Sequence, residues 1–310
     1  MLHLRKLTLS LITGTALLAA PAIADDHAQA AAASVAVPAA EATAKTGPAL
    51  WKVADEDTTI YLFGTVHALP KDIDWSTSAL ENALAASDSV VTEIKMTPEI
   101  ATEMQQLVMA KGVLPSGTTL RSLLNPEQTA AFESAMGKLG IPAEAFDRFE
   151  PWYAGMMVTM LPLLQQGYSP DDGVEKVILT KAGSKEQQAL ETIAFQIGIF
   201  DGLPQDAQIA FLTQAAAGID EIKPMLDKMV AEWLEGDAEA LAQLMNEGMT
   251  DPALADALLY ARNRTWADWI DTRLDAPGTV FVAVGAGHLA GEKSVQDALS
   301  ERGIETVRVQ

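Results

Sequence analysis

The stretch TTIYLFGTVHALP, Thr58–Pro70, begins as an apolar run typical of a buried strand and continues into Gly64-Thr65-Val66-His67. The stretch VFVAVGAGHLAG, residues 280–291, repeats this setting, with an apolar strand followed by Gly285-Ala286-Gly287-His288. Two Gly-x-x-His turns therefore close two predicted strands that lie far apart in the chain. The chain has four histidines, and the other two lie in the N-terminal segment that is predicted not to fold.

Further strand patterns lie near both ends of the chain, and helical patterns fill its middle. The predicted strands are Leu50–Val53, Thr58–Phe63, Ser89–Ile94, Lys185–Glu191, Gly278–His288 and Glu305–Gln310. Cap residues followed by proline, as in Thr97-Pro98, Asn125-Pro126 and Asp251-Pro252, mark helix starts. The pattern predicts an α/β fold, in which a central mixed sheet is formed by the N- and C-terminal segments and carries a large helical insertion at about 98–274.

The N-terminal segment has the features of an export signal. Arg5 and Lys6 precede an apolar stretch, and Ala22-Ile23-Ala24 is a small-x-small cleavage site. We predict a signal peptide at 1–24, a disordered Ala-rich linker at 25–47 and one α/β domain at 48–310. The alternative is an uncleaved anchor, but the apolar stretch is short for a span. The mature protein, beginning at Asp25, is therefore predicted to be exported, either periplasmic or secreted.

Composition excludes several classes of function. The formal net charge of −21 disfavours nucleic acid and anionic lipid as partners. The absence of cysteine excludes disulfides, zinc–thiolate sites and cysteine nucleophiles. No later run is apolar and long enough for stable membrane insertion after signal cleavage. The sequence has no glycine-rich phosphate loop and no Gly-x-Ser-x-Gly motif, and it indicates no particular oligomeric state.

The two histidines and one glutamate suggest a metal site. Strands of an α/β sheet bring their carboxyl ends to one crevice, and Gly64 and Gly285 would permit sharp turns and close approach there. His67 and His288 with Glu93, at the end of the predicted strand SVVTEI, supply an N/N/O ligand set for a divalent metal that activates water. The alternatives are turn histidines bonded to backbone, and a salt bridge or helix cap for Glu93.

Several blocks of the sequence resemble the TraB/GumN family, whose superfamily includes the Tiki metalloproteases. The resemblance runs from about Pro48 to the C-terminus and is carried by LWKV…TTIYLFGTVHALP, SDSVVTEI, EPWYAGMM, GVEKVI, ALETIAFQ, ARNRTWADWI and FVAVGAGHLAGEKSVQDALSERGIETVRV. It implies a metal-dependent hydrolase, with manganese- or cobalt-supported peptidase activity in the Tiki branch. We predict a peptide or protein substrate and a divalent metal, which is manganese, cobalt or zinc. The resemblance also implies functional roles at matching positions, which are Gly64, His67, Glu93, Arg262, Gly285 and His288.

The sequence departs from the family pattern at two positions. Glu150 precedes Pro151-Trp152 where lysine is common, and Glu175 stands where aspartate is expected. Glu175 could line the crevice or serve as a helix N-terminal acid. Glu191 and Gln196 could contact the metal ligands without binding the metal themselves, or they could cap the helix that follows Thr192.

Two hypotheses of function follow. In the first, the protein is an exported metallopeptidase in which His67, His288 and Glu93 bind the metal, Glu93 serving as a ligand or general base. Arg262 stabilises negative charge in the transition state, or else forms a structural salt bridge. In the second, the protein binds or sequesters a peptide signal, a metal or a haem-like ligand without turnover, as the pheromone-shutdown and haem-binding relatives suggest.

Overall fold

The computed structural model describes residues 47–310 except 96 and 249–251. The predicted signal peptide and nearly all of the predicted linker lie outside these residues. Within them the protein is a mixed α/β structure, as predicted, in which six strands form one sheet in the order β6-β4-β7-β2-β1-β8. The strands are β1 Leu50–Ala54, β2 Thr58–Thr65, β4 Ser89–Thr92, β6 Glu186–Ala189, β7 Gly278–Gly285 and β8 Val307–Arg308.

The centre of the sheet is the parallel pair β2 and β7, which come from opposite ends of the described chain. Their register joins Thr65 to Gly285, so the two Gly-x-x-His turns leave the sheet side by side. β4 extends the parallel ladder on one side of β7, and β1 pairs antiparallel with β2 on the other side. The chain-terminal strand β8 pairs antiparallel with β1 at the far edge.

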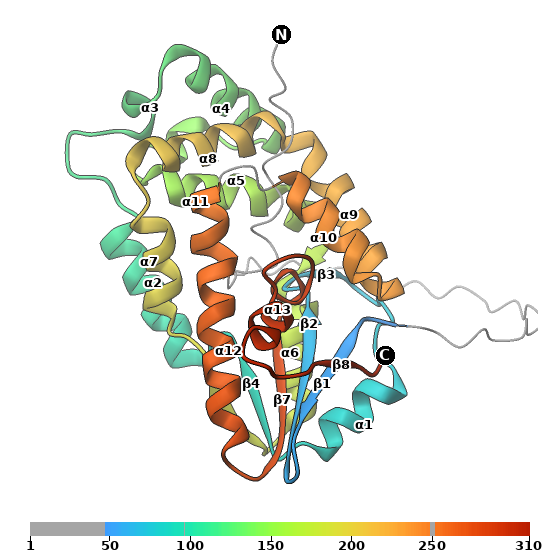
Figure 1. The fold of residues 1–310 in the computed structure, drawn as a ribbon. Coiled ribbons are helices and arrows are strands. Elements are labelled where there is room, and N and C mark those ends of the chain that lie inside the picture. The colour runs from blue at the N-terminus through green and yellow to red at the C-terminus, as the bar shows by residue number, and fades with distance from the viewer. Residues whose placement is uncertain (1–46, 96, 249–251) are drawn as a thin grey trace, which may run out of the picture.

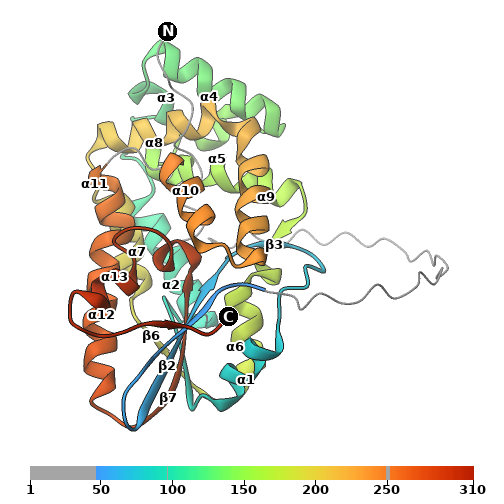
Figure 2. The ribbon, with the colours of Figure 1, turned by 45° about the vertical axis from the view of Figure 1, so that its right-hand side comes forward.

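Helices surround the sheet and fill the region beyond its carboxyl end (Figures 1 and 2). The helices are α1 Ser78–Ala86, α2 Pro98–Lys111, α3 Leu120–Leu123, α4 Pro126–Leu139, α5 Pro151–Gln165, α6 Val174–Ala182, α7 Ile193–Asp201, α8 Gln205–Ala217, α9 Ile219–Glu235, α10 Ala238–Gly248, α11 Pro252–Ala255, α12 Ala261–Leu274 and α13 Val295–Ser300. A π-helical segment, Asp256–Tyr260, leads directly into α12. None of the described helices is long and apolar enough to cross a membrane.

Two clusters of buried side chains cover the two faces of the sheet. Side chains of α12 and α13 pack with β2 and β7 on one face, through residues such as Trp266, Ile270 and Val282. The other face belongs to a larger cluster that includes α1, α6 and most of the helical middle. The sheet therefore lies between helical layers, with its carboxyl end directed towards the helical middle (Figure 1).

The helical middle contributes strands to the two sheets as well as helices. It contains β6, which pairs in parallel with β4 and ends the sheet on that side. It also contains β5, Tyr168–Ser169, which pairs with β3, Leu69–Pro70, in a small second sheet that the sequence patterns did not predict. The predicted strand Lys185–Glu191 is confirmed in its core, Glu186–Ala189.

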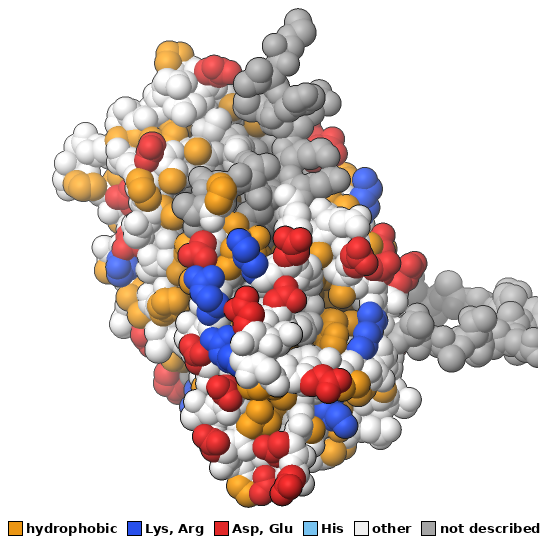
Figure 3. Space-filling view, viewed as in Figure 1, with side chains coloured by type: hydrophobic (Ala, Val, Ile, Leu, Met, Phe, Trp, Pro, Cys, Tyr) orange, Lys and Arg blue, Asp and Glu red, His pale blue; other side chains and the backbone are white. Residues whose placement is uncertain are grey.

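The predicted helix starts are confirmed where the structure describes them. Thr97 and Asn125 each cap a helix whose first residue is proline, because their side-chain oxygens accept from the N–H of Ile100 and Gln128. The third predicted cap, Asp251, lies outside the described residues. Acidic and basic side chains are mixed across the face in Figure 3, which shows no continuous basic patch there.

Candidate functional site

All nine predicted site residues lie at or near the carboxyl ends of β2, β4 and β7. They fall into two groups, a partly buried pair of His67 with Glu175 and a buried network around Arg262. Glu93 connects the groups, since its pKa responds to the charges of both His67 and Arg262. The sequence prediction that distant segments meet at this end of the sheet is borne out by the position of the strands.

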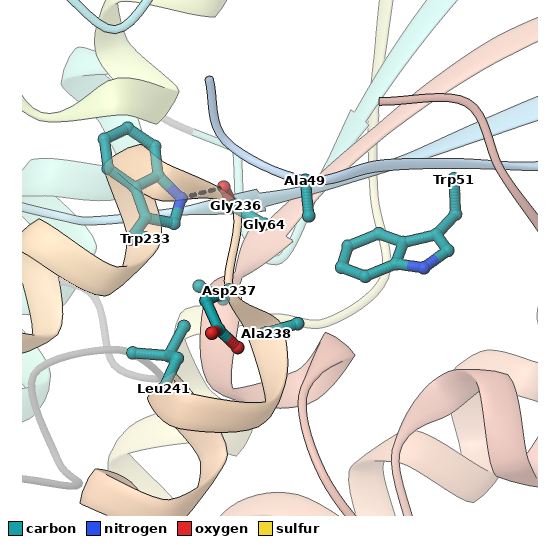
Figure 4. Close-up of a pocket in the computed structure, with 9 residues that line it drawn as sticks. Ala49, Trp51, Gly64, Trp233, Gly236, Asp237, Ala238 and Leu241 are labelled. Atoms are coloured by element: carbon teal, nitrogen blue, oxygen red, sulfur yellow. Dashed lines mark hydrogen bonds between the residues drawn. The ribbon is translucent and has the colours of Figure 1, made fainter. Parts of the chain in front are cut away.

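Glycine is required at position 64 by close packing and not by a turn. It lies inside β2, and a Cβ built on it would lie 2.9 Å from the Cα of Ala286 in the second motif. Its carbonyl accepts from Trp233 Nε1 of α9 at 2.8 Å (Figure 4). Neither Gly64 nor Gly285 has a positive φ, so the sharp turn expected of these glycines is not their role.

His67 is held by Glu175, from the first turn of α6. His67 Nδ1 forms a short ion pair with Glu175 Oε1, and the hydroxyl of Thr65 donates to the same oxygen. The helix can start here because Gly173 has no side chain, and a Cβ on it would lie 2.2 Å from the carbonyl oxygen of His67. The N–H of Val174 donates to the carbonyl of Val66 at 3.0 Å and fixes the same contact.

The second ring nitrogen of His67 has no partner. Nε2 is buried and makes no hydrogen bond within the described part of the chain. Burial lowers the pKa of His67, but the charge and hydrogen bond of Glu175 outweigh it and leave the pKa raised. The pKa of Glu175 is lowered in turn, because His67 and Thr65 outweigh the effect of burial on that carboxyl. His67 therefore presents a buried nitrogen, and Glu175 favours the protonated form of its ring.

Glu93 lies just beyond β4 and is 4 % exposed. Its Oε1 accepts from the N–H of Gly285 at 2.8 Å, and its Oε2 accepts from Arg262 Nη2 at 2.5 Å and from Gln196 Nε2 at 3.0 Å. Burial raises the pKa of the Glu93 carboxyl, against the opposing charges of Arg262 and His67. A carboxyl with a raised pKa and buried donors around it is suited to taking up a proton.

Arg262 is a buried cation with two glutamate partners. Its Nε and Nη2 donate to the two oxygens of Glu191 at 2.8 and 2.9 Å, while Nη2 also reaches Glu93. Its Nη1 donates to the carbonyl of Leu258 at 2.9 Å, and its guanidinium lies 4.8 Å from the ring centre of Trp266. The salt bridge that was the alternative role for both Arg262 and Glu93 is thus present between them.

His288 is completely buried and held in one tautomer. Its Nε2 lies 3.1 Å from Arg262 Nη1, which can only donate, so Nε2 accepts and Nδ1 carries the proton. Nδ1–H donates to Asn263 Oδ1 at 2.6 Å, and Asn263 Nδ2 donates in turn to the carbonyl of Lys293 at 2.8 Å. Burial and the charges of Arg262 and His67 lower the pKa of His288 well below its ordinary value, which keeps it neutral.

Glu191 and Gln196 belong to the same network. Gln196 Nε2 donates to Glu191 Oε2 at 3.0 Å as well as to Glu93, and Trp266 Nε1 donates to Glu191 Oε1 at 2.9 Å. Thr192 caps α7 with its own side chain, which accepts from the N–H of Phe195 at 3.2 Å. The capping alternative for Glu191 and Gln196 is therefore wrong.

A cavity of about 540 Å³ opens beside these residues. His67, Glu93, Glu175 and Gln196 contribute to its wall, and Gly173 also lines it. Its apolar lining includes Ile94, Pro98, Ala101, Pro170 and Leu179. Arg262 and His288, only 1 % and 0 % exposed, lie behind this wall, where Arg262 bonds Glu93 and His288 bonds Arg262.

The three predicted ligands have only some of the properties that a divalent metal site requires. His67 has the chemistry of a ligand, because a carboxylate holds its Nδ1 and leaves its buried Nε2 unpartnered. Arg262 bonds both Glu93 and His288, however, and places a positive charge beside them. Across residues 47–310, outside the gaps at 96 and 249–251, no group of three or more His, Asp or Glu side chains is arranged to hold a metal ion. As arranged, the three predicted ligands do not fit a metal centre.

Sequence reasoning missed Thr65, Gly173, Asn263 and Trp266. Asn263 and Trp266 stand in the same block as Arg262, at the neighbouring position and one helical turn onward, which was the available signal. Comparison with known proteins identifies the family of the chain. No curated protein and no solved structure matches the chain. The TraB/PrgY/gumN family profile matches residues 49–308, which is most of the chain, so the chain belongs to the TraB/PrgY/gumN family.

Proposed function

We propose that this protein is an exported hydrolase that cleaves amide bonds of peptides in the cavity beside His67 and Glu93. The observation that carries the proposal is the unpartnered, buried Nε2 of His67 next to a carboxyl with a raised pKa. Such a pair supplies a proton donor and a proton acceptor in one cavity. Membership of the TraB/PrgY/gumN family and the cavity lining support it.

The proposed chemistry uses the residues of the cavity wall. Glu93 takes a proton from a water molecule as the water oxygen attacks the carbonyl carbon of the substrate. Protonated His67, with its Nδ1–H held by Glu175, gives a proton from Nε2 to the amide nitrogen, and the carbon–nitrogen bond breaks. The products are an acid and an amine, and Glu93 returns its proton to solvent or to His67.

Arg262 and His288 support Glu93 in this scheme. Because Arg262 is buried behind the cavity wall, it acts through Glu93 and not on the substrate. Neutral His288 accepts from Arg262 and so fixes the guanidinium without adding a second positive charge.

The test is a digest of a mixed peptide library by the mature protein, followed by mass spectrometry. We expect several turnovers for each protein molecule, and a rate loss of about a hundredfold or more for Glu93→Gln and for His67→Ala. Glu103→Gln, on the exposed surface of α2, is the matched control. Capture of one peptide equivalent without cleavage would favour the binding-protein hypothesis instead.

The divalent metal stays a prediction. The sequence predicts His67, His288 and Glu93 as its ligands, and a metal bound there would supply an activated water molecule, but as arranged these residues do not fit a metal centre. The steps above do not use it, because Arg262 lies against two of these three residues. Calorimetry with Mn²⁺ at about pH 7.5, where free histidine is neutral, tests it. One tight equivalent that is lost in both His67→Ala and His288→Ala would establish the centre, while equal binding by all three proteins would reject it.

Export is tested separately from the chemistry. Mass spectrometry of the protein recovered outside the cytoplasm should show an N-terminus at Asp25. An intact N-terminus would contradict cleavage of the predicted signal.

A further inference from the structure

The charged side chains that line the candidate-site cavity all have partners of opposite charge. They are His67, Glu93, Asp171, Glu175 and Lys176. Glu175 pairs with His67, Asp171 pairs with Lys176, and Glu93 is bonded by Arg262 from behind the cavity wall. Among the described residues, the lining therefore offers no unpaired charge. A charged substrate side chain would lose its hydration there without gaining a counter-charge.

Most of the exposed lining of this cavity is apolar and comes from three segments. Ile94 directly follows Glu93 at the end of β4. Leu179 lies one turn after Glu175, on the same face of α6. The first turn of α2 adds Pro98. An apolar side chain of a substrate would be removed from water against these residues, which favours its binding.

The cavity can hold a short stretch of peptide. Its volume of about 540 Å³ lies within the range of roughly 300–1,000 Å³ that is usual for small-ligand sites. Ile94 and Leu179 stand beside Glu93 and Glu175 in the wall, so a side chain held against them would belong to a residue close to the cleaved bond.

Leu179 is the more accessible of these two apolar residues. Ile94 is 6 % exposed, whereas Leu179 is half-buried and packs against the edge of the larger core cluster. A substitution at position 179 should therefore change the cavity wall with less effect on the core than a substitution at position 94.

We propose that the cavity selects peptides that carry a neutral, apolar side chain, such as leucine or phenylalanine, next to the cleaved bond, and that Leu179 is a specificity-determining residue. The position of the cleaved bond rests on the proposed function, but the preference in binding does not. Lysine, arginine, aspartate and glutamate at the same position of the peptide are disfavoured, because the charges of the lining already satisfy one another.

The test measures binding and cleavage separately. Five labelled peptides share one glycine–serine background and differ at a single central residue, which is leucine, phenylalanine, asparagine, lysine or glutamate. Fluorescence anisotropy gives their affinities for the mature protein, and mass spectrometry of competing peptides gives relative kcat/KM. The leucine and phenylalanine peptides should bind about tenfold or more tightly than the other three. Asparagine is similar to leucine in size, so that comparison reports polarity and not volume.

Two variants of Leu179 connect the preference to the cavity. Leu179→Ala should weaken binding of the leucine peptide severalfold and leave the asparagine peptide unchanged. Leu179→Lys adds a cation to the lining and should make the glutamate peptide bind more tightly than the lysine peptide. Ala130→Lys, on the exposed surface of α4, makes the same change in net charge and is the matched control. Circular dichroism checks folding, and Leu179→Ala with the peptide series on the unaltered protein decides the question if Leu179→Lys does not fold.

The outcomes distinguish two failures. If the apolar peptides bind preferentially and the Leu179 variants lose that preference, but no peptide is cleaved, the proposed hydrolase is wrong and apolar selection stands. If peptides are cleaved with equal kcat/KM, or with a preference that both Leu179 variants keep, the hydrolase stands and apolar selection is overturned. Tighter binding of the lysine or glutamate peptide by the unaltered protein, or no binding of any peptide at millimolar protein, also overturns apolar selection.

Discussion

The pair of His67 and Glu175 shows how single residues set the proton chemistry of this site. Burial alone would keep the imidazole neutral, but the carboxylate at Nδ1 reverses that effect. Glutamate at 175, where the family pattern led us to expect aspartate, reaches both His67 and Thr65 from the start of α6. The close approach depends on Gly173, where any side chain would meet the backbone of His67.

Glu175→Gln should lower the pKa of His67 and destabilise the fold in a defined pH range. The raised pKa of His67 contributes stability that is complete below the unfolded value of 6.5 and is lost as pH rises through the folded pKa. The lowered pKa of Glu175 contributes stability above 4.5 that is lost as pH falls through its folded pKa. The loss in unfolding free energy should thus be largest between these values, at about 3 kcal/mol.

Urea unfolding of the metal-free protein across pH measures this loss, and NMR of the imidazole protons gives the pKa. Glu103→Gln, an exposed carboxylate of α2, controls for the change in net charge. A loss that grows steadily above pH 6.5 would have the opposite sign and would contradict the pairing.

At the scale of elements, the turn that precedes α12 shapes the network around Arg262. The π-helical segment Asp256–Tyr260 runs directly into α12, and its Leu258 carbonyl accepts from the guanidinium. Such π turns often mark functional positions in helices. The N–H of Gly285 from β7 and the guanidinium of Arg262 both bond Glu93, which follows β4, so three separate elements meet at this glutamate.

Arg262→Met should cost about 3–5 kcal/mol of unfolding free energy, because it leaves Glu93 and Glu191 buried without a counter-charge. Replacing both glutamates by glutamine in the same protein should recover part of that loss. Arg264→Met, one turn from the π segment with an exposed partner in Asp256, should change stability little. Urea denaturation compares the variants, and a further loss on adding the glutamines would mean that packing and not charge is responsible.

The sequence predicted the positions of strands and helices better than it predicted the contacts between side chains. Apolar runs and cap residues located β2, β7 and the starts of α2 and α4, since these depend on local chemistry. The repeated Gly-x-x-His setting also led to His67 and His288. Thr65 and Asn263 were missed because their roles arise from packing between segments distant in sequence. The burial of Arg262 behind the cavity wall could not be predicted either, because it also depends on packing between segments distant in sequence.

At the scale of the whole molecule, sheet and helical middle share one core. Phe63 of β2 packs with Phe281 of β7 and with Trp233 of α9, at ring-centre distances of 6.0 and 6.4 Å. The same cluster of buried side chains continues to Trp152 and Phe132 in the helices beyond the sheet. The helical middle also completes the sheet through β6 and supplies Glu175 and Glu191 to the site.

This shared core predicts that residues 48–310 unfold as one unit. The helices cannot lose their packing without exposing the strand side chains of the same cluster, so their transitions should be coupled. Far-UV circular dichroism, which reports mainly on the helices, and tryptophan fluorescence, to which Trp51 of β1 contributes, should give the same urea midpoint. The isolated segment 98–274 should fail to fold, because it would expose the apolar surfaces that β2 and β7 cover and leave β6 without β4. Two separated transitions, or a cooperative melt of the isolated segment, would show instead that the helical middle is an independent domain placed over a separate sheet.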